Sequence, residues 1–297
     1  MECVLLPNWL RKILYLLPSY NSNDAQIDGS MVFTNDCKDI SKLITLNELF
    51  EKQSAKIYCR INIPVGAGQR QRALAMLKLC KNIGIEPIAL LDHYYNNSSM
   101  VERITQVAST STTIFEIFNE LPGCSYPGEQ IVNNDVLIGK INGYDAIIKK
   151  YCSNAKTISM ASLNILHTSE LTEYGWRPED GTNLYQQQFI VENLSTDYTG
   201  IHLYCSSYGQ KRQFWDLMKA EWLKKKPLFI TECGEAITGK HIGFYKSWTS
   251  RFVKYLNPEA IMWYRQSTQT QSSADAGFAL ETVDGWKSDL YTKLMKD

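Results

Sequence analysis

The chain has 297 residues, of which 44% are hydrophobic and 21% are charged, as in an ordinary globular protein. Lysine and arginine together number 31, as do aspartate and glutamate, so the formal net charge is zero. Such a chain has no basic field that attracts a nucleic acid or an anionic membrane, and we expect neither as a partner.

The first 29 residues show no clear hydrophobic period. Their apolar stretch is interrupted by Glu2, Arg11, Lys12 and two prolines, so it predicts neither a transmembrane helix nor a regular signal peptide. We interpret residues 1–29 as an N-terminal extension that packs on the main domain.

Eight runs of strand length follow this extension. They are almost wholly apolar, which is typical of a parallel sheet covered by helices. The runs span residues 30–34, 56–63, 85–93, 113–119, 156–163, 200–205, 227–232 and 259–264.

Stretches with helical spacing separate the strand runs and follow the last of them. Eight strands that each precede a helix are typical of a (β/α)8 barrel, or TIM barrel, which is an α/β fold in one domain. We therefore predict a single (β/α)8 barrel over residues 30–297. The helical stretches span residues 38–54, 68–83, 98–109, 129–153, 183–194, 209–225, 241–256 and 285–296.

Polar and aromatic residues gather where these strands end. In (β/α)8 barrels the chemistry is built from the carboxyl ends of the strands. The strand ends are "CRINIP" with Arg60, "LLDHYY" with His93, "FEIFNEL" with Asn119 and Glu120, "IHLY" with His202 and Tyr204, "PLFITECGE" with Glu232, and "IMWY" with Trp263.

Two glutamates are expected to face each other across the barrel. Residues two apart on a strand face the same way, so Phe118 shares a face with Glu120 and Ile230 shares a face with Glu232. If Phe118 and Ile230 face the interior, both carboxylates rise into the barrel mouth from opposite strands.

Two opposed carboxyl groups suit the hydrolysis of a glycosidic bond. One of them gives a proton to the leaving oxygen, while the other is ionised and attacks or shields the anomeric carbon. His202 and Tyr204 are placed to keep Glu232 ionised by donating hydrogen bonds, and Asn119 to bond a sugar hydroxyl. Trp263 offers a flat apolar face to a sugar ring.

These segments resemble the strand motifs of clan A retaining glycoside hydrolases, a (β/α)8 superfamily with its acid/base on strand four and its nucleophile on strand seven. "FEIFNEL" is similar to the family pattern E-x-W-N-E-P, and the other five segments are similar to its motifs on strands two, three, six, seven and eight. Phe118 and Leu121 stand where the family has tryptophan and proline, and strand one has no recognisable signature, so the exact family stays open.

The resemblance implies a role for each matching residue. Glu120 is implied as the acid/base and Glu232 as the nucleophile of a double displacement on a carbohydrate substrate, with no metal or organic cofactor. The residues implied to surround the first sugar are Arg60, His93, Asn119, His202, Tyr204 and Trp263.

Three further residues have competing interpretations. Glu116 lies deeper than Glu120, and we interpret it as an ion-pair partner of Arg60 because a buried carboxylate without a partner is unfavourable. Glu235 competes with Glu232 as the nucleophile; we prefer Glu232 because it ends the apolar run directly. Trp176, in the loop after the fifth strand, either binds sugar or caps the barrel, and we favour binding.

The function predicted from the sequence is a retaining glycosidase that acts on an oligo- or polysaccharide. The alternative is a saccharide-binding or structural barrel that inherited the fold without the chemistry. A phosphate-binding isomerase is disfavoured because no glycine-rich phosphate loop follows the seventh or eighth strand.

The cysteines and histidines predict no metal site. The eight cysteines form no CxxC pair, and the four histidines show no HxxxH or HxH spacing. Reduced cysteines and the missing export signal favour the cytoplasm, with release by lysis or on a viral particle as the alternative for a polysaccharide substrate.

Overall fold

The computed structural model describes residues 13–16, 58–63, 66–82, 84–91, 97–119, 134–159, 183–204, 220–234, 255–263, 267–268 and 281–282. The main sheet has eight parallel strands in the order β5-β4-β3-β2-β1-β8-β7-β6. They are β1 (Ile13–Leu16), β2 (Tyr58–Ile63), β3 (Glu86–Leu91), β4 (Ile114–Ile117), β5 (Lys156–Ile158), β6 (Thr199–Tyr204), β7 (Leu228–Gly234) and β8 (Ala260–Trp263); β9 (Ser267–Thr268) and β10 (Glu281–Thr282) form a separate pair.

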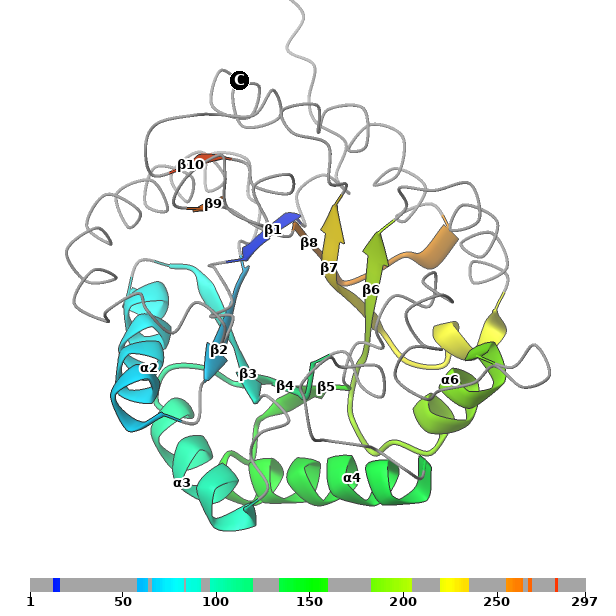
Figure 1. Ribbon diagram of the computed structural model, residues 1–297, viewed down its shortest axis with the longest axis horizontal. Coiled ribbons are helices and arrows are strands. Elements are labelled where there is room, and N and C mark those ends of the chain that lie inside the picture. The colour runs from blue at the N-terminus through cyan, green and yellow to red at the C-terminus, as the bar shows by residue number, and fades with distance from the viewer. Residues whose placement is uncertain are drawn as a thin grey trace, which may run out of the picture.

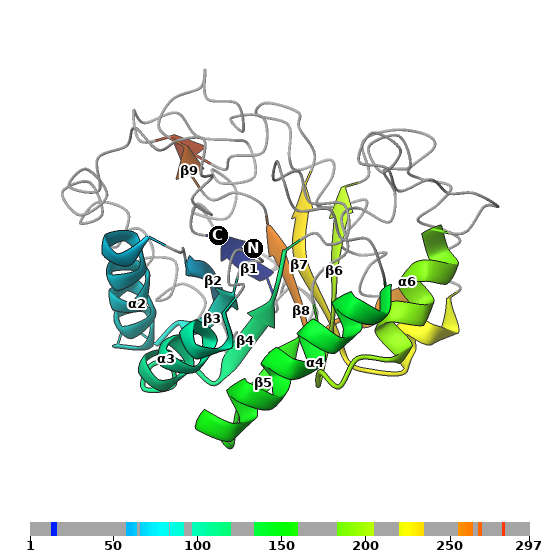
Figure 2. The same cartoon turned by 60° about the horizontal axis from the view of Figure 1, so that its bottom comes forward.

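The helices lie outside the strands (Figures 1 and 2). The strands from β2 to β8 and the four α-helices overlap the runs predicted from the sequence. No helix in the described part of the chain combines the length and hydropathy needed to cross a membrane. The helices are α2 (Ala67–Asn82), α3 (Ser98–Ala108), α4 (Asn134–Tyr151), α6 (Asn183–Glu192) and the 3-10 helix η3 (Glu221–Lys224).

Local signals explain two of the helix ends. Gly84 adopts a positive φ of 81° after α2, and the next amide, of Ile85, donates to the carbonyl of Cys80 at 2.9 Å, as in a glycine-terminated helix. At the start of α3, the side chain of Asn97 accepts a 2.8 Å hydrogen bond from the amide of Ser99. Both devices satisfy backbone groups that a helix end leaves unpaired.

The first strand of the sheet differs from the prediction. β1 lies between β2 and β8, with Tyr15 opposite Cys59 and Ile13 opposite Ile261. Residues 13–16 therefore belong to the sheet, although the sequence pattern placed them in an extension. The run predicted as the first strand, residues 30–34, lies outside the described residues.

Two apolar clusters, an outer and an inner one, show which way the strand residues face. The outer cluster is the larger; it contains both strand and helix residues and fills the space between the sheet and the helices. The smaller, inner cluster draws its buried members from strands alone and lies on the face of the sheet turned away from the helices. Those members are Ile88, Ile114, Ile158, Phe229, Ala260 and Met262, with Tyr58 and Tyr198 packed against them.

The two strands at the ends of the sheet order are joined through Tyr198, which immediately precedes β6. Its amide donates to the carbonyl of Thr157 at 2.9 Å, and its carbonyl accepts from the amide of Ser159 at 3.0 Å. These bonds form a parallel bridge between Ile158 of β5 and Tyr198.

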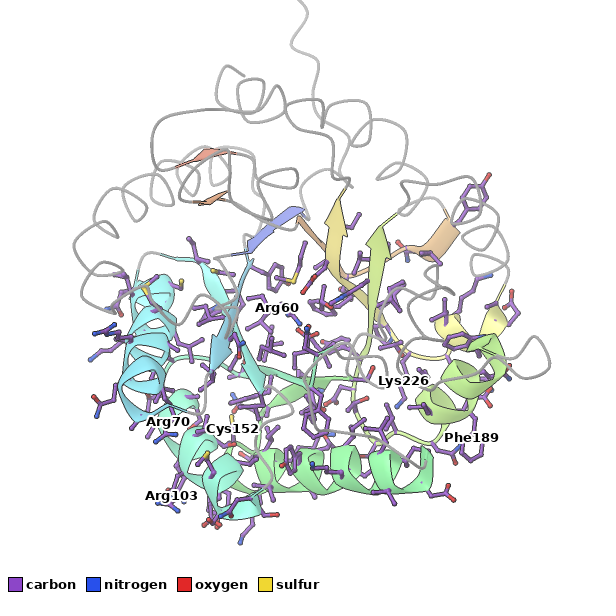
Figure 3. All side chains as sticks on the ribbon, viewed as in Figure 1. Arg60, Arg70, Arg103, Cys152, Phe189 and Lys226 are labelled. Carbon is purple, nitrogen blue, oxygen red and sulfur yellow. The ribbon has the colours of Figure 1, made fainter. Side chains whose placement is uncertain are left out.

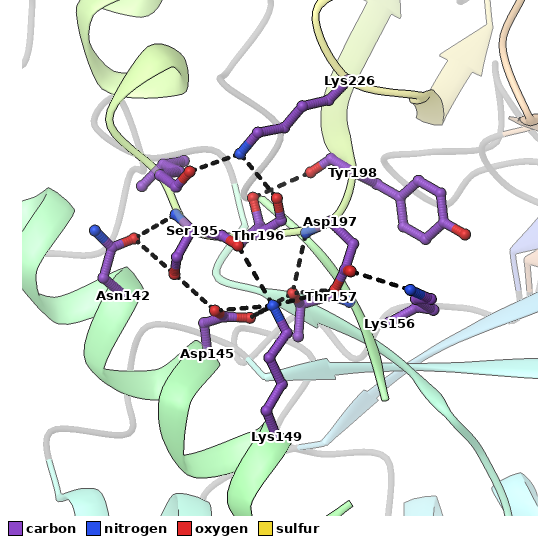
Figure 4. A network of polar contacts seen from close by, with 11 residues as sticks. Asn142, Asp145, Lys149, Lys156, Thr157, Ser195, Thr196, Asp197, Tyr198 and Lys226 are labelled. Atoms are coloured by element: carbon purple, nitrogen blue, oxygen red, sulfur yellow. Dashed lines mark hydrogen bonds and ion pairs between the residues drawn. The ribbon is translucent and has the colours of Figure 1, made fainter. Parts of the chain in front are cut away.

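A polar network on α4 secures the same junction from outside (Figure 4). The buried carboxylate of Asp145 accepts hydrogen bonds from the hydroxyls of Thr157 at 2.5 Å and Ser195 at 2.6 Å. Asp197 accepts from the Thr157 amide at 3.1 Å, and Lys149 lies 2.9 Å from Asp145 and 3.3 Å from Asp197. The network thus ties α4 to β5 and to the segment that leads into β6.

Candidate active site

Arg60 of β2 lies on the side of the strands that is turned away from the helices (Figure 3). Its neighbours Cys59 and Ile61 belong to the outer cluster, so strand alternation directs Arg60 to the interior. Only 2% of Arg60 is exposed. A guanidinium buried to this degree requires anionic or polar partners.

Within the described part of the chain, three side chains accept hydrogen bonds from Arg60. Glu116 of β4 accepts from Nε and, at 3.0 Å, from Nη2. Glu232 of β7 accepts from Nη1 at 2.6 Å, and Asn119 accepts from Nη2 at 2.6 Å. The predicted ion pair between Arg60 and Glu116 is confirmed, and the guanidinium also links the ends of β4 and β7.

Phe118 breaks the strand alternation that was used to predict this site. Ile114 and Glu116 face the interior, so regular alternation would direct Phe118 there too. Instead Phe118 adopts a φ of 65° and joins the outer cluster. The condition that Phe118 faces the interior is therefore not met, and it is Asn119 that turns toward Arg60.

The outward position of Phe118 is held by α4. Its ring lies 5.1 Å from the ring of Tyr144, centroid to centroid, and the Nζ atom of Lys140 lies 5.6 Å from its centroid. The Phe118 amide still donates to the carbonyl of Leu91 at 2.8 Å, so Phe118 stays hydrogen-bonded to the end of β3. A left-handed conformation is unfavourable for a residue with a side chain, and this packing offsets it.

An irregularity in β7 directs Glu232 inward. Phe229 belongs to the inner cluster and Ile230 to the outer one, so the condition that Ile230 faces the interior is not met either. The register advances from Ile201 opposite Ile230 to His202 opposite Glu232, which leaves Thr231 as an extra residue. This bulge reverses the alternation and explains why Glu232 reaches Arg60.

His202 of β6 approaches the same carboxylate. It is fully buried, and its Nε2 atom lies 3.5 Å from Oε1 of Glu232. Burial lowers the pKa of His202 to about 4, against the opposing attraction of Glu232. The imidazole is therefore neutral near pH 7, and Arg60 supplies the positive charge beside Glu232.

Arg60 keeps its charge in spite of its burial. Burial by itself lowers the pKa of the guanidinium, but the attraction of Glu116 and then of Glu232 outweighs burial and raises it above the ordinary value. One cation thus serves two carboxylates, which are 0% and 5% exposed.

The structure brings four of the predicted site residues together: Arg60, Asn119, His202 and Glu232. The backbones of Tyr204 and Trp263 lie at the ends of β6 and β8, but their side chains are outside the described part. Their contacts with a sugar therefore stay predictions. The predicted residues that lie wholly outside the described ranges are His93, Glu120 and Trp176, together with the competing Glu235.

Sequence reasoning did not name Asn62, which lies two residues after Arg60 on β2 and so shares its face; the segment "CRINIP" contained this signal. The turn at Phe118 had no signal, because phenylalanine is not a residue that favours a positive φ.

The described residues form a site in which a carboxylate can act as a nucleophile or stabilise a positive charge. The carboxyl group of Glu232 on β7 receives a hydrogen bond from a buried guanidinium, and a neutral imidazole lies beside it. An amide from the end of β4 is fixed by the same guanidinium.

This chain is similar to known proteins in its structure but matches none of them in sequence. No protein-family model matches it, and no curated protein matches it in sequence. A family 128 (subgroup VI) exo-β-1,3-glucanase from Aureobasidium namibiae matches with a TM-score of 0.58 and 12% identity, over 96% of each chain. An endo-β-1,4-glucanase from Xanthomonas axonopodis pv. citri matches with a TM-score of 0.59 and 11% identity, over 96% of this chain and 97% of that one.

A psychrophilic family 10 endo-β-1,4-xylanase also matches, with a TM-score of 0.55 and 11% identity over 96% of each chain. At such low identity the likeness concerns the fold. The chain shares the fold of TIM-barrel glycoside hydrolases, in agreement with the resemblance that its strand-end motifs show to clan A.

Proposed function

We propose that this protein is a retaining glycoside hydrolase that cleaves O-glycosidic bonds of an oligo- or polysaccharide. Glu232 is the nucleophile and Glu120 is the acid/base. The observation that carries the proposal is the position of Glu232: a buried carboxylate at the end of β7, held by Arg60 at 2.6 Å, with His202 at 3.5 Å.

The same guanidinium supports the role of Glu120. Arg60 fixes Asn119 at 2.6 Å, and Glu120 is the next residue in the chain. The acid/base is thereby tethered to a group that also contacts the nucleophile. In a retaining enzyme the two carboxyl groups lie about 5–5.5 Å apart, and we expect that separation between Glu120 and Glu232.

The reaction proceeds in two displacements. Glu120 protonates the leaving oxygen while Glu232 attacks the anomeric carbon and forms a glycosyl ester. Glu120 then removes a proton from water, which attacks the same carbon and releases Glu232. Two inversions leave the anomeric configuration unchanged.

The scaffold of this site is proposed to be a closed (β/α)8 barrel. The hydrogen bonds of Tyr198 to Thr157 and Ser159 support closure between β5 and β6. The inner cluster, which collects apolar side chains from several strands, is also expected inside a closed ring.

The solved structures suggest where to look for the substrate. The three described above are named as enzymes of β-1,3-glucan, β-1,4-glucan and β-1,4-xylan. We propose a β-linked polysaccharide of this kind, with Tyr204, Trp263, His93 and Trp176 as further sugar contacts.

The test is hydrolysis by the purified protein of aryl β-glycosides, β-glucans and xylan, with the anomer of the first product followed by NMR. We expect retention, and we expect Glu232→Gln and Glu120→Gln to lower kcat by at least about 1,000-fold. Glu221→Gln, at an exposed side chain of η3, is the control and keeps full activity. Inverted product, or ordinary turnover by Glu232→Gln, contradicts the proposal.

A further inference from the structure

Glu116 is a charged residue at an interior position that β4 could fill with an apolar side chain. Its partners in the sheet register are Leu90 on β3 and Ile158 on β5, and Ile114, two residues earlier on the same face, belongs to the inner cluster. Glu116 is fully buried. A buried ion pair is often no more stable than apolar side chains of similar volume, so stability alone does not explain why Glu116 occupies this layer.

Balancing the charge of Arg60 does not require Glu116, because Glu232 carries a negative charge and accepts from Nη1 at 2.6 Å. Without Glu116, the planar fork of Arg60 can turn and donate two parallel hydrogen bonds to Glu232, the arrangement that arginine and carboxylate groups prefer. A nucleophile bound in this way is more strongly stabilised as an anion and therefore attacks more slowly.

Glu116 prevents that arrangement by engaging the other edge of the guanidinium. It accepts from both Nε and Nη2 of Arg60, which leaves Nη1 directed at Glu232 and lets Nη2 also reach Asn119. The orientation of the fork thus determines how many hydrogen bonds the carboxylate on β7 receives and where the amide on β4 is held.

We propose that Glu116 is a positioning residue for the hydrolytic reaction. It binds the Nε and Nη2 edge of the Arg60 guanidinium, so that Glu232 receives a single guanidinium N–H and Asn119 is fixed beside Glu120. The inference rests on the proposed function. Glu116 does not touch the sugar; it acts through Arg60, and its negative charge also opposes over-stabilisation of the Glu232 anion.

The test compares Glu116→Gln and Glu116→Asp with the wild type on an aryl β-glycoside that the wild type hydrolyses. Gln keeps the shape and removes the charge, so we expect kcat to fall by about tenfold or more while KM changes by less than about threefold. The Asp variant keeps the charge on a shorter side chain, and we expect it to recover a substantial part of the loss.

The pH profile separates positioning from a purely structural role. Among the described residues, Arg60 and His202 lie against Glu232, and Glu116 contacts Arg60. Glu116→Gln removes a negative charge from this group of residues. We therefore expect the acidic limb of kcat/KM to move to lower pH. Asp145→Asn, which removes a buried carboxylate on α4, is the control and leaves the acidic limb in place.

Crystal structures of the wild type and Glu116→Gln separate this inference from the proposed function. We expect the guanidinium of the variant to turn toward Glu232 and lose its contact with Asn119. If the wild type hydrolyses no glycoside, the proposed function fails while the turned guanidinium still supports the positioning geometry. An unmoved Arg60, or a folded Glu116→Gln enzyme with wild-type kcat and pH profile, overturns the inference.

Discussion

Asn119 and Glu232 accept hydrogen bonds from two nitrogen atoms of one guanidinium, Nη2 and Nη1 of Arg60, each at 2.6 Å. A planar group that is bonded to both residues fixes the end of β4 relative to the end of β7. A shift of the Arg60 guanidinium would therefore displace both Asn119 and Glu232, on the two sides of the proposed reaction centre.

Arg60→Lys keeps the charge but replaces the fork by one flexible amine, which does not reproduce bonds to three acceptors in different directions. We expect kcat/KM to fall by about 100-fold and the free energy of unfolding to fall by roughly 1–3 kcal/mol. Steady-state kinetics and urea unfolding measure the two effects. Arg103→Lys on the exposed face of α3 is the control, and equal losses in both variants would refute the explanation.

Phe118 combines a φ of 65° with full burial, so we expect its alanine and glycine variants to differ in stability in an unusual order. Phe118→Ala and Phe118→Gly both lose the ring contact with Tyr144, a loss of roughly 3–5 kcal/mol. Glycine alone adopts the left-handed conformation without strain, so we expect Phe118→Gly to be about 1 kcal/mol more stable than Phe118→Ala.

Phe115, three residues earlier and equally buried, is the matched control for Phe118 because it has no positive φ. There we expect the opposite order, with Phe115→Ala more stable than Phe115→Gly. Thermal unfolding of the four variants decides the matter; the same order at both positions would show that the backbone of Phe118 is not strained.

His202 should make the protein sensitive to acid. Its pKa falls from 6.5 to about 4 on folding, so between these values the unfolded chain binds the proton and the folded chain does not. Stability contributed by the neutral imidazole is complete above about pH 6.5 and is lost as the pH falls toward about 4, a change on the order of 3 kcal/mol.

The measurement is urea unfolding of the wild type and His202→Gln at several pH values between about 4 and 7. The glutamine variant has no imidazole to protonate, so its unfolding free energy should depend less on pH than that of the wild type. Parallel pH curves for the two proteins would count against a neutral buried imidazole.

Asp197 tests the network at the junction of β5 and β6 (Figure 4). Burial acts to raise the pKa of Asp197, but hydrogen bonds from the Thr157 amide, Lys156 and Lys149 outweigh it and lower the pKa below 3.8. A lowered carboxyl pKa stabilises the fold above the pKa of the unfolded chain, and this contribution disappears as the pH falls through the folded value.

Asp197→Asn should therefore lower the free energy of unfolding by roughly 1–2 kcal/mol at neutral pH, and this difference from the wild type should become smaller in acid. Urea unfolding of both proteins from neutral to acidic pH measures the difference. Glu221→Gln, which breaks an exposed pair with Lys224, should have an effect below about 1 kcal/mol at neutral pH. A difference for Asp197→Asn that stays constant with pH would be inconsistent with the role of its charge.

The sequence predicted the sheet well from β2 to β8, because strands buried on both faces are continuous apolar runs and their helices have a different period. It failed at β1. The four residues "ILYL" are a weak signal between charged residues and prolines, and only pairing with β2 and β8 reveals them as a strand.

The predicted site depended on regular alternation, which fails at Phe118 and Thr231. Each irregularity moves the following residue to the other face, so Asn119 and Glu232 both contact Arg60 although the assumed directions of Phe118 and Ile230 were wrong. Neither a left-handed phenylalanine nor a bulge is encoded by local residue preference. Both are decided by packing and by pairing with neighbouring strands.

The most direct test of the account is mass spectrometry after incubation with a dinitrophenyl 2-deoxy-2-fluoro-β-glycoside of the sugar that the enzyme hydrolyses. Fluorine slows the breakdown of a glycosyl ester, so a retaining enzyme accumulates one. The account predicts one fluorosugar on the peptide that contains Glu232, at its carboxylate. A label on Glu235 or any other residue, or an active enzyme that never becomes labelled, would contradict it.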